Sequence, residues 1–124
     1  MSIGKLLGLT VLATPLTSEE GRRILERDHY RCQYCGFDGM SSFENSLSMT
    51  VDFVHPRAKR GRKDPSNLVA ACRPCNVLKG YRLFHDFQSA KAFVLQRREA
   101  MRKSWDASAV PLADTDREPV GTRA

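Results

Sequence analysis

The sequence has no apolar stretch long enough to cross a lipid bilayer. Residues 6–12, LLGLTVL, form a run of seven residues, whereas a spanning helix needs about 20. As a secretion signal this run is weak, because one lysine precedes it and no clear small-residue cleavage site follows. We therefore expect no membrane partner. We interpret residues 1–16 as an apolar segment that packs, as a strand or short helix, on the rest of the chain.

The chain also lacks an internal repeat and the length for a second domain. Its 124 residues suit one domain, and a hydrophobic content of 41% excludes a chain that is disordered throughout. A core of this size gains stability from a bound metal. Residues 106–124 are rich in Pro, Ala, Asp and Thr without periodicity, which predicts a disordered tail. Residues 17–105 remain as the expected domain.

Acidic residues are in the minority. The chain has 20 Lys and Arg against 14 Asp and Glu, a formal charge of +6. An excess of this size favours a polyanionic partner, with nucleic acid as the first candidate. Charge alone leaves open the alternative of a basic protein with no such partner.

Cysteine occurs only as two CxxC pairs, with 36 residues between Cys35 and Cys72. A secreted disulfide framework and a redox-active pair are the alternatives to a metal site. Neither pair lies in a thioredoxin-like pattern of strand and helix, and each lies beside turn-forming residues. We therefore predict that Cys32, Cys35, Cys72 and Cys75 bind one structural zinc ion. Zinc-bound thiolates fit a reducing compartment, so we expect a cytoplasmic protein.

The first half of the chain predicts a helix, a zinc knuckle and a strand. Thr17 and Glu20 have the capping-box spacing for a helix that starts near Glu19 and ends near His29. A loop is expected over residues 38–46. Apolar residues alternate over 47–54, which predicts a strand with Asp52 on its mostly polar face.

The second half predicts a loop, a second strand and two helices. The second strand covers residues 68–71, and a short helix over 76–79 ends at Gly80. A long helix is expected from about Phe87 to Trp105. Its apolar stripe should pack on the core, and its outer face should carry basic residues. The stripe comprises Phe87, Ala90, Phe93, Val94, Met101 and Trp105; the outer face carries Arg98, Arg102 and Lys103. From this order of helices and strands we expect the α+β fold class.

The loop between the two strands is strongly basic. Because it separates the two halves of the expected site, we interpret it as a phosphate-contacting loop. A solvated charge run is the alternative. The expected nucleic-acid contacts are Arg57, Lys59, Arg60, Arg62 and Lys63 of the loop, with Arg73 and Lys79 near the second knuckle.

Three stretches together resemble the zinc-knuckle members of the HNH endonuclease family. They are CQYCG, TVDFVHPRA and NLVAACRPCNVLKG, and the resemblance covers about residues 30–82. It implies a ββα-metal core, braced here by the four-cysteine zinc site and flanked by N- and C-terminal helices. It also implies cleavage of DNA, or sometimes RNA, with one divalent metal ion.

The resemblance assigns roles to three polar residues. Asp52 matches the acid that binds the catalytic metal, and Asn76 matches the third signature position, a metal ligand that is His or Asn. Asn67 matches the asparagine whose hydrogen bonds hold the loop. The departure is at Phe53, because the family places its general-base histidine there and a phenyl ring accepts no proton. His55, two residues on, is the candidate replacement; His29 and His85 are interpreted as ordinary surface or packing residues.

The chemistry of these side chains supports the same assignment. Mg²⁺ or Mn²⁺ prefers oxygen ligands and keeps several waters, so a carboxylate and an amide oxygen, from Asp52 and Asn76, suffice as protein ligands. A histidine with a pKa near ~6.5 suits activation of water. His55 is the only histidine close in sequence.

The sequence leaves three hypotheses open. The first is a metal-dependent nuclease, with DNA as the first choice of substrate. The second is a zinc-stabilised nucleic-acid-binding module that has lost cleavage, which Phe53 favours. The third is a zinc-ribbon interaction protein, which leaves Asn76 unexplained. Sequence preference should be weak in any of these unless a partner or a homodimer supplies it.

Overall fold

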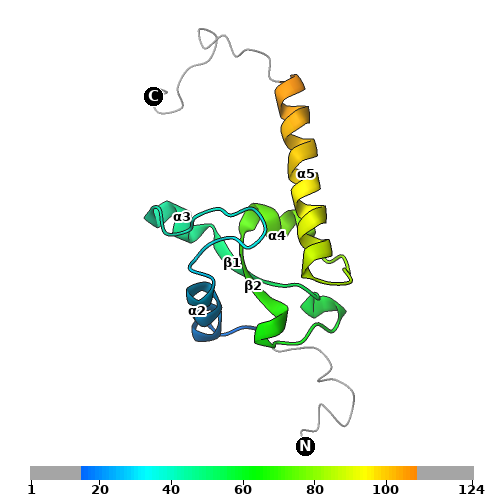
Figure 1. The fold of residues 1–124 in the computed structure, drawn as a ribbon. Coiled ribbons are helices and arrows are strands. Elements are labelled where there is room, and N and C mark those ends of the chain that lie inside the picture. The colour runs from blue at the N-terminus through cyan, green and yellow to red at the C-terminus, as the bar shows by residue number, and fades with distance from the viewer. Residues whose placement is uncertain (1–14, 109–124) are drawn as a thin grey trace, which may run out of the picture.

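The computed structural model describes residues 15–108. Four helices and two strands form this part of the chain (Figure 1). In chain order they are α2 (Ser18–Arg27), α3 (Phe43–Leu47), β1 (Met49–Phe53), β2 (Leu68–Cys72), α4 (Arg73–Lys79) and α5 (Phe87–Ser108). Two 3₁₀ turns, η2 (Arg57–Lys59) and η3 (Pro65–Asn67), lie between the strands. Of the predicted apolar segment 1–16, residues 1–14 lie outside the described residues. Of the predicted disordered tail 106–124, residues 109–124 also lie outside them, and residues 106–108 belong to α5 instead.

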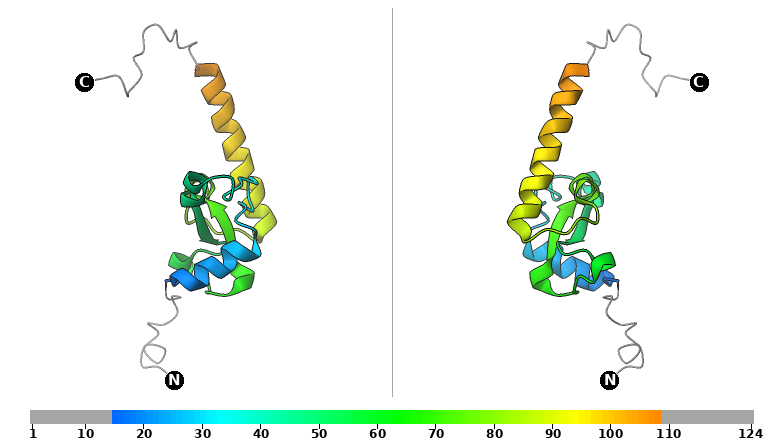
Figure 2. Two further views of the ribbon diagram at one scale, coloured as in Figure 1. Left: turned by 90° about the vertical axis from the view of Figure 1, so that its left-hand side faces the viewer. Right: turned by 90° about the vertical axis from the view of Figure 1, so that its right-hand side faces the viewer.

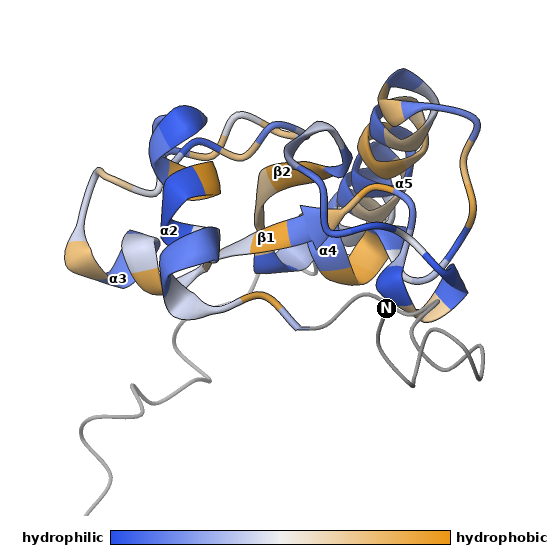
Figure 3. Ribbon diagram, turned by 90° about the horizontal axis from the view of Figure 1, so that it is seen from below, coloured by the Kyte–Doolittle hydropathy of each residue, from blue (hydrophilic) through white to orange (hydrophobic). Residues whose placement is uncertain are grey.

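The two strands pair antiparallel, with Met49 opposite Cys72 and Phe53 opposite Leu68. Helices α2 and α4 both contact β1 and β2. Figure 3 shows the strands between α2 on one side and α4 on the other. The order of strand, loop, strand and helix is the predicted one, and the α+β class with a ββα core is confirmed.

Helix α2 begins with the predicted capping box. The Thr17 hydroxyl accepts a hydrogen bond from the Glu20 N–H at 3.1 Å, and the Thr17 N–H donates to Glu20 Oε1 at 2.9 Å. These bonds satisfy two backbone donors that the helix itself cannot. At the other end, Arg27 donates to the carbonyl of Leu68 at 2.6 Å and Asp28 accepts from the N–H of Ala70 at 2.8 Å. The end of α2 is thereby tied to β2.

The polar face of β1 is not a solvent face at Asp52. Asp52, expected on the mostly polar face, is only 4% exposed. Alternation of polar and apolar residues identifies a solvent face only when one side of a sheet meets water. Here α2 and α4 both contact the two strands (Figure 3), and the Asp52 side chain is buried although it lies on the polar face.

Helix α5 is longer than predicted and packs along only part of its length. It ends at Ser108 instead of near Trp105. Ala90 and Val94 are fully buried, whereas Met101 is 57% exposed and Trp105 67% exposed. Figure 2 shows the C-terminal part of α5 projecting beyond the other elements. The prediction that the whole stripe packs on the core is therefore wrong for its last two members.

Among residues 15–108, no helix is both long and apolar enough to cross a membrane.

Candidate functional site

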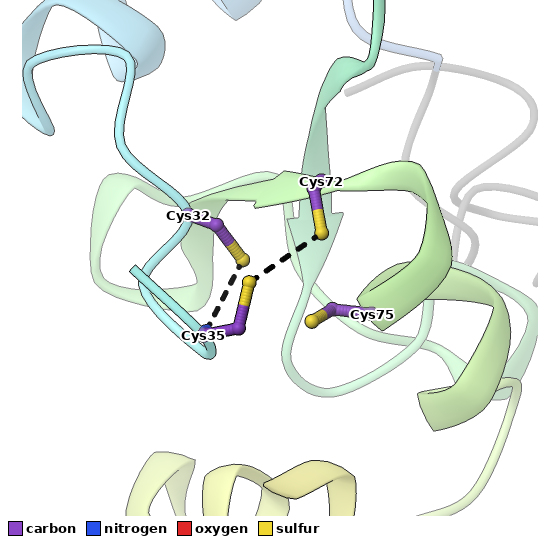
Figure 4. A group of neighbouring side chains, drawn as sticks. All are labelled: Cys32, Cys35, Cys72 and Cys75. Atoms are coloured by element: carbon purple, nitrogen blue, oxygen red, sulfur yellow. Dashed lines mark hydrogen bonds between the residues drawn. The ribbon is translucent and has the colours of Figure 1, made fainter. Parts of the chain in front are cut away.

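The four cysteines converge at one point, as the two CxxC pairs predict. Cys32 and Cys35 come from the loop after α2, Cys72 from the end of β2 and Cys75 from α4 (Figure 4). All four sulfur atoms lie within 4.8 Å of one another, and the Cys35 and Cys72 sulfurs are 3.7 Å apart. A tetrahedral zinc site with ordinary Zn–S bonds requires sulfurs about 3.8 Å apart. The four thiols are thus able to hold a zinc ion.

A bound cation would offset the mutual repulsion of ionised thiols in this cluster. A hydrogen bond from Cys75 lowers the pKa of Cys32 to about 4, whereas burial raises the pKa of Cys72 to about 11. The pKa of Cys75 is also raised, first because its thiol is hydrogen-bonded to Cys32. Buried thiols this close cannot all ionise by themselves, because each thiolate repels the next. A dication removes that conflict, since a coordinating thiol loses its proton outright.

Arg98 lies beside the cluster, although the sequence placed it on the outer face of α5. Its Nη1 is 3.6 Å from the sulfur of Cys75, within hydrogen-bonding distance. The half-buried guanidinium therefore offsets negative charge that four thiolates would leave around one dication. The signal for this position was present in the sequence. Arg98 follows Val94 by four residues and precedes Met101 by three, so it shares the packing stripe.

Asp52 lies at the centre of a buried polar network. Its Oδ2 accepts a hydrogen bond from the Tyr34 hydroxyl at 2.5 Å, and its Oδ1 is 3.3 Å from Lys79 Nζ. Burial raises the pKa of Asp52, and the neighbouring Lys79 ammonium opposes that shift. Burial and the charge of Asp52 together raise the pKa of Tyr34. The carboxylate that was expected to face a metal ion therefore has two partners from the protein.

Lys79 is the clearest correction to the predicted site. It was expected to contact nucleic acid, but its side chain is fully buried. Its ammonium donates to the carbonyl of Phe53 at 2.9 Å in addition to pairing with Asp52. A lysine is buried this deeply only when it is paired. Lys79 thus belongs to the interior and is not available to a phosphate.

Asp52 and Asn76 nevertheless share one cavity. It has a volume of about 490 Å³, and Arg57 and Phe53 also line it. Within residues 15–108, the half-buried side chain of Asn76 has no hydrogen-bond partner. An amide oxygen, a carboxylate and room for several waters suit a hard divalent cation such as Mg²⁺. The nearby ammonium of Lys79 competes for the same carboxylate and should weaken the binding of such an ion.

Asn67 holds the loop between the strands. Its Oδ1 accepts a hydrogen bond from the His55 N–H at 2.8 Å. Its Nδ2 donates to the carbonyls of Arg62 at 2.9 Å and His55 at 3.1 Å. Gly61 lies against the same turn, where a side chain would overlap the His55 carbonyl. These contacts fix the two ends of the basic loop relative to each other.

His55 does not line the cavity of Asp52 and Asn76. Its imidazole is exposed, with Nε2 2.7 Å from the carbonyl oxygen of Lys59. This contact joins the His55 ring, which follows β1, to the last residue of η2. Phe53 lines the cavity instead. None of the three histidines of the chain lies on this cavity.

The basic loop is mostly exposed. Arg57, Lys59, Arg60 and Arg62 have exposed side chains. Lys63 is half-buried and pairs with Glu20 of α2 at 3.0 Å. Arg73, at the start of α4, is also exposed, but it lies beside the zinc knuckle and not on the cavity. The predicted contact residues therefore divide between a loop surface, a separate arginine and the buried Lys79.

Comparison with known protein families identifies the segment that carries these features. Residues 32–82 match the HNH endonuclease family model. This HNH segment spans both knuckles, both strands, the basic loop and α4. The resemblance inferred from the sequence is thus confirmed over these residues, and members of the family act on nucleic acid. Searches of curated proteins and of solved structures found no match to the chain.

Loss of zinc should unfold the HNH segment. Structural zinc contributes about 10 kcal/mol or more to folding, which is comparable with the whole net stability of a small domain, about 5–15 kcal/mol. We expect Cys72→Ser, or a strong chelator, to abolish the cooperative thermal transition seen by circular dichroism. Adding zinc back should restore the transition in the chelated protein but not in the variant. An unchanged melting curve after zinc removal would contradict this.

Removal of the Lys79 ammonium should destabilise the domain. Lys79→Met keeps the length of the side chain but leaves the Asp52 carboxylate buried without its cation. Breaking one partner of a buried pair costs about 3–5 kcal/mol. The free energy of unfolding, measured with urea on the zinc-loaded protein, should fall by that order. The exposed loop variant Lys59→Met is the matched control and should change it by no more than about 0.5 kcal/mol. Equal effects of the two variants would show that the buried pair has no structural importance.

Proposed function

We propose that the chain is a metal-dependent nuclease of the HNH type, with DNA as its first substrate. The observation that supports this most directly is the cavity shared by Asp52, Asn76 and Arg57 within the HNH segment. A module that only binds nucleic acid needs no acid and amide on one cavity. Mg²⁺ or Mn²⁺, held by Asp52 and Asn76, would neutralise charge on a phosphoryl oxygen and stabilise the leaving oxygen.

The residues around the cavity supply the other requirements of phosphodiester cleavage. Arg57 lies at the cavity itself and belongs to the basic loop, so a phosphate bound there meets a cation of the protein. Asn67 keeps the loop closed over the strand ends through its three hydrogen bonds. Because the loop is already held in one conformation, phosphate binding there does not lose free energy to ordering the loop.

The weak point of the site is activation of water. His55 is committed to the Lys59 carbonyl and lies off the cavity, and Phe53 occupies the position of the family's base. General-base assistance contributes about 10²–10⁴-fold to a rate. We therefore propose a slow enzyme in which metal and substrate positioning provide most of the acceleration.

A second candidate function is nucleic-acid binding without cleavage. The observation that favours it is the buried pair of Asp52 and Lys79, in which an ammonium already lies beside the carboxylate. In this case the HNH segment would serve as a zinc-braced scaffold for the basic loop.

Cleavage of supercoiled plasmid separates the two candidates. Zinc-loaded protein should nick the plasmid when Mg²⁺ or Mn²⁺ is added. It should not nick the plasmid when Mg²⁺ and Mn²⁺ are removed and the structural zinc is retained. Asn76→Ala is the decisive variant, because it removes a ligand without breaking a hydrogen bond, whereas Asp52→Ala would strand the Lys79 ammonium. We expect Asn76→Ala to lower the nicking rate by about tenfold or more. His55→Ala should have a smaller effect.

The control for this experiment is Gln88→Ala, which removes an exposed amide side chain on α5 that lines neither this cavity nor the one beside α4. It should nick at the parental rate. Absence of nicking with either metal, while DNA binding persists, would exclude the nuclease and leave the binding module. Nicking that is equal in Asn76→Ala and Gln88→Ala would show that the activity comes from elsewhere.

Binding to DNA should depend steeply on salt. Each phosphate neutralised by a basic residue releases counterions, so log K falls against log salt with a slope of about −0.9 per contact. Arg60→Ala should reduce this slope by about 1. Arg23→Ala is the matched control, since Arg23 is exposed on α2 and already pairs with Glu19 at 2.9 Å. Affinity that stays constant from low to high salt would rule out the basic loop as a phosphate surface.

A further inference from the structure

A second cavity, larger than that of the candidate site, lies between α4 and α5. This groove has a volume of about 950 Å³ and is lined mainly by apolar side chains. Several are strongly exposed for their type: Val77 by 77%, Trp105 by 67%, Met101 by 57% and Leu95 by 39%. Exposed apolar residues that gather in one groove mark a docking surface more often than isolated ones do.

The groove arises because the packing stripe of α5 continues past the body of the domain. Ala90 and Val94 are buried against the core, and Met101 and Trp105 prolong the same side of the helix. From Leu95 to Ser108 the helix runs for about 21 Å at its usual rise. Figures 1 and 2 show this part projecting beyond the other elements. An apolar stripe on an amphipathic helix is typical of a surface that another element covers.

The chain's own C-terminal residues are a poor occupant. Residues 109–124 contain Val110, Leu112 and Val120 as their only large aliphatic side chains. Ordering a residue costs about as much backbone entropy as burying one aliphatic side chain gains. Three such side chains among sixteen residues do not offset that cost. A preformed helix avoids it.

One acidic and one basic residue on α5 suit a second copy of the same helix. Glu99 and Arg102 both line the groove, as do Arg73 and Arg98, and Arg98 already contacts the sulfur of Cys75. When two copies of α5 cross antiparallel near these residues, Glu99 of each copy meets Arg102 of the other, and both pairs form at once. A two-fold interface requires this kind of self-complementarity.

We propose that this groove is the interface of a symmetric homodimer, in which α5 of a second copy lies antiparallel against α5 and over α4. Trp105 and Met101 of each copy cover Val77 and Leu95 of the other. The cavity of Asp52 and Asn76 shares no lining residue with this groove. Dimerisation therefore leaves both candidate active sites open and joins two HNH segments in one particle.

Sedimentation equilibrium of the zinc-loaded full chain tests this directly. The mass should double with rising concentration, and the emission of Trp105, the only tryptophan, should shift to the blue over the same range. Met101→Lys and Trp105→Lys should each raise the dissociation constant about tenfold or more, because each buries a charge without a partner. Ala100→Lys is the matched control: Ala100 is exposed on the same helix but outside the groove, and its dimer should persist.

Four outcomes would contradict the proposed homodimer. A monomeric mass at all concentrations, with the circular dichroism of α5 intact, would overturn the proposal. So would a dimer that Met101→Lys and Ala100→Lys weaken equally. A monomer whose Trp105 emission shifts to the red when residues 109–124 are deleted would assign the groove to the chain's own end. Association that occurs only with added DNA would assign it to the nucleic acid.

Discussion

The convergence of four thiols from two distant parts of the chain is the constraint on which the other features depend. Cys32 and Cys35 follow α2, whereas Cys72 and Cys75 lie at the junction of β2 and α4. Within residues 15–108 the sheet has two strands, and a pair of strands is marginal by itself. A zinc ion held by these four thiols would fix the end of β2 and the start of α4 in one place. That geometry sets where Asn76, one residue after Cys75, points relative to Asp52 on the paired strand.

The interior beside this junction combines two demands that conflict. Stability favours a cation next to the buried carboxylate of Asp52, and Lys79 provides it at 3.3 Å. Metal-dependent cleavage favours the same carboxylate with a lone pair available to a divalent ion. The two share one anion, so a metal must bind in the field of an ammonium. This competition, together with Phe53 at the position of the usual base, is the physical reason to expect weak metal affinity and slow turnover.

Much of this arrangement was predictable from the sequence, and the misses have a common cause. The capping box, the strand pair, the cysteine cluster and the HNH resemblance all follow from local spacing, which the chain preserves when it folds. The missed features depend on which elements pack against each other. They are the burial of Lys79, the contact of Arg98 with the sulfur of Cys75, and the burial of Asp52. Lysine and arginine are usually exposed, so their residue type argues against an interior position. Only the spacing of Arg98 from Val94 and Met101 indicated its place on the packing stripe. His55 was adjacent to the site in sequence, but the turn after Pro56 directs its ring to the Lys59 carbonyl.

The central claim is that a divalent ion binds beside Asp52 and Asn76 in a domain already braced by zinc. Titration of Mn²⁺ into the zinc-loaded protein, followed by electron paramagnetic resonance of the free ion, measures this without relying on activity. One weak Mn²⁺ site per chain, lost in Asn76→Ala and retained in Gln88→Ala, is the predicted result. Absence of any Mn²⁺ site, or a site that Asn76→Ala leaves unchanged, would contradict it and leave Lys79 as the only cation that Asp52 binds.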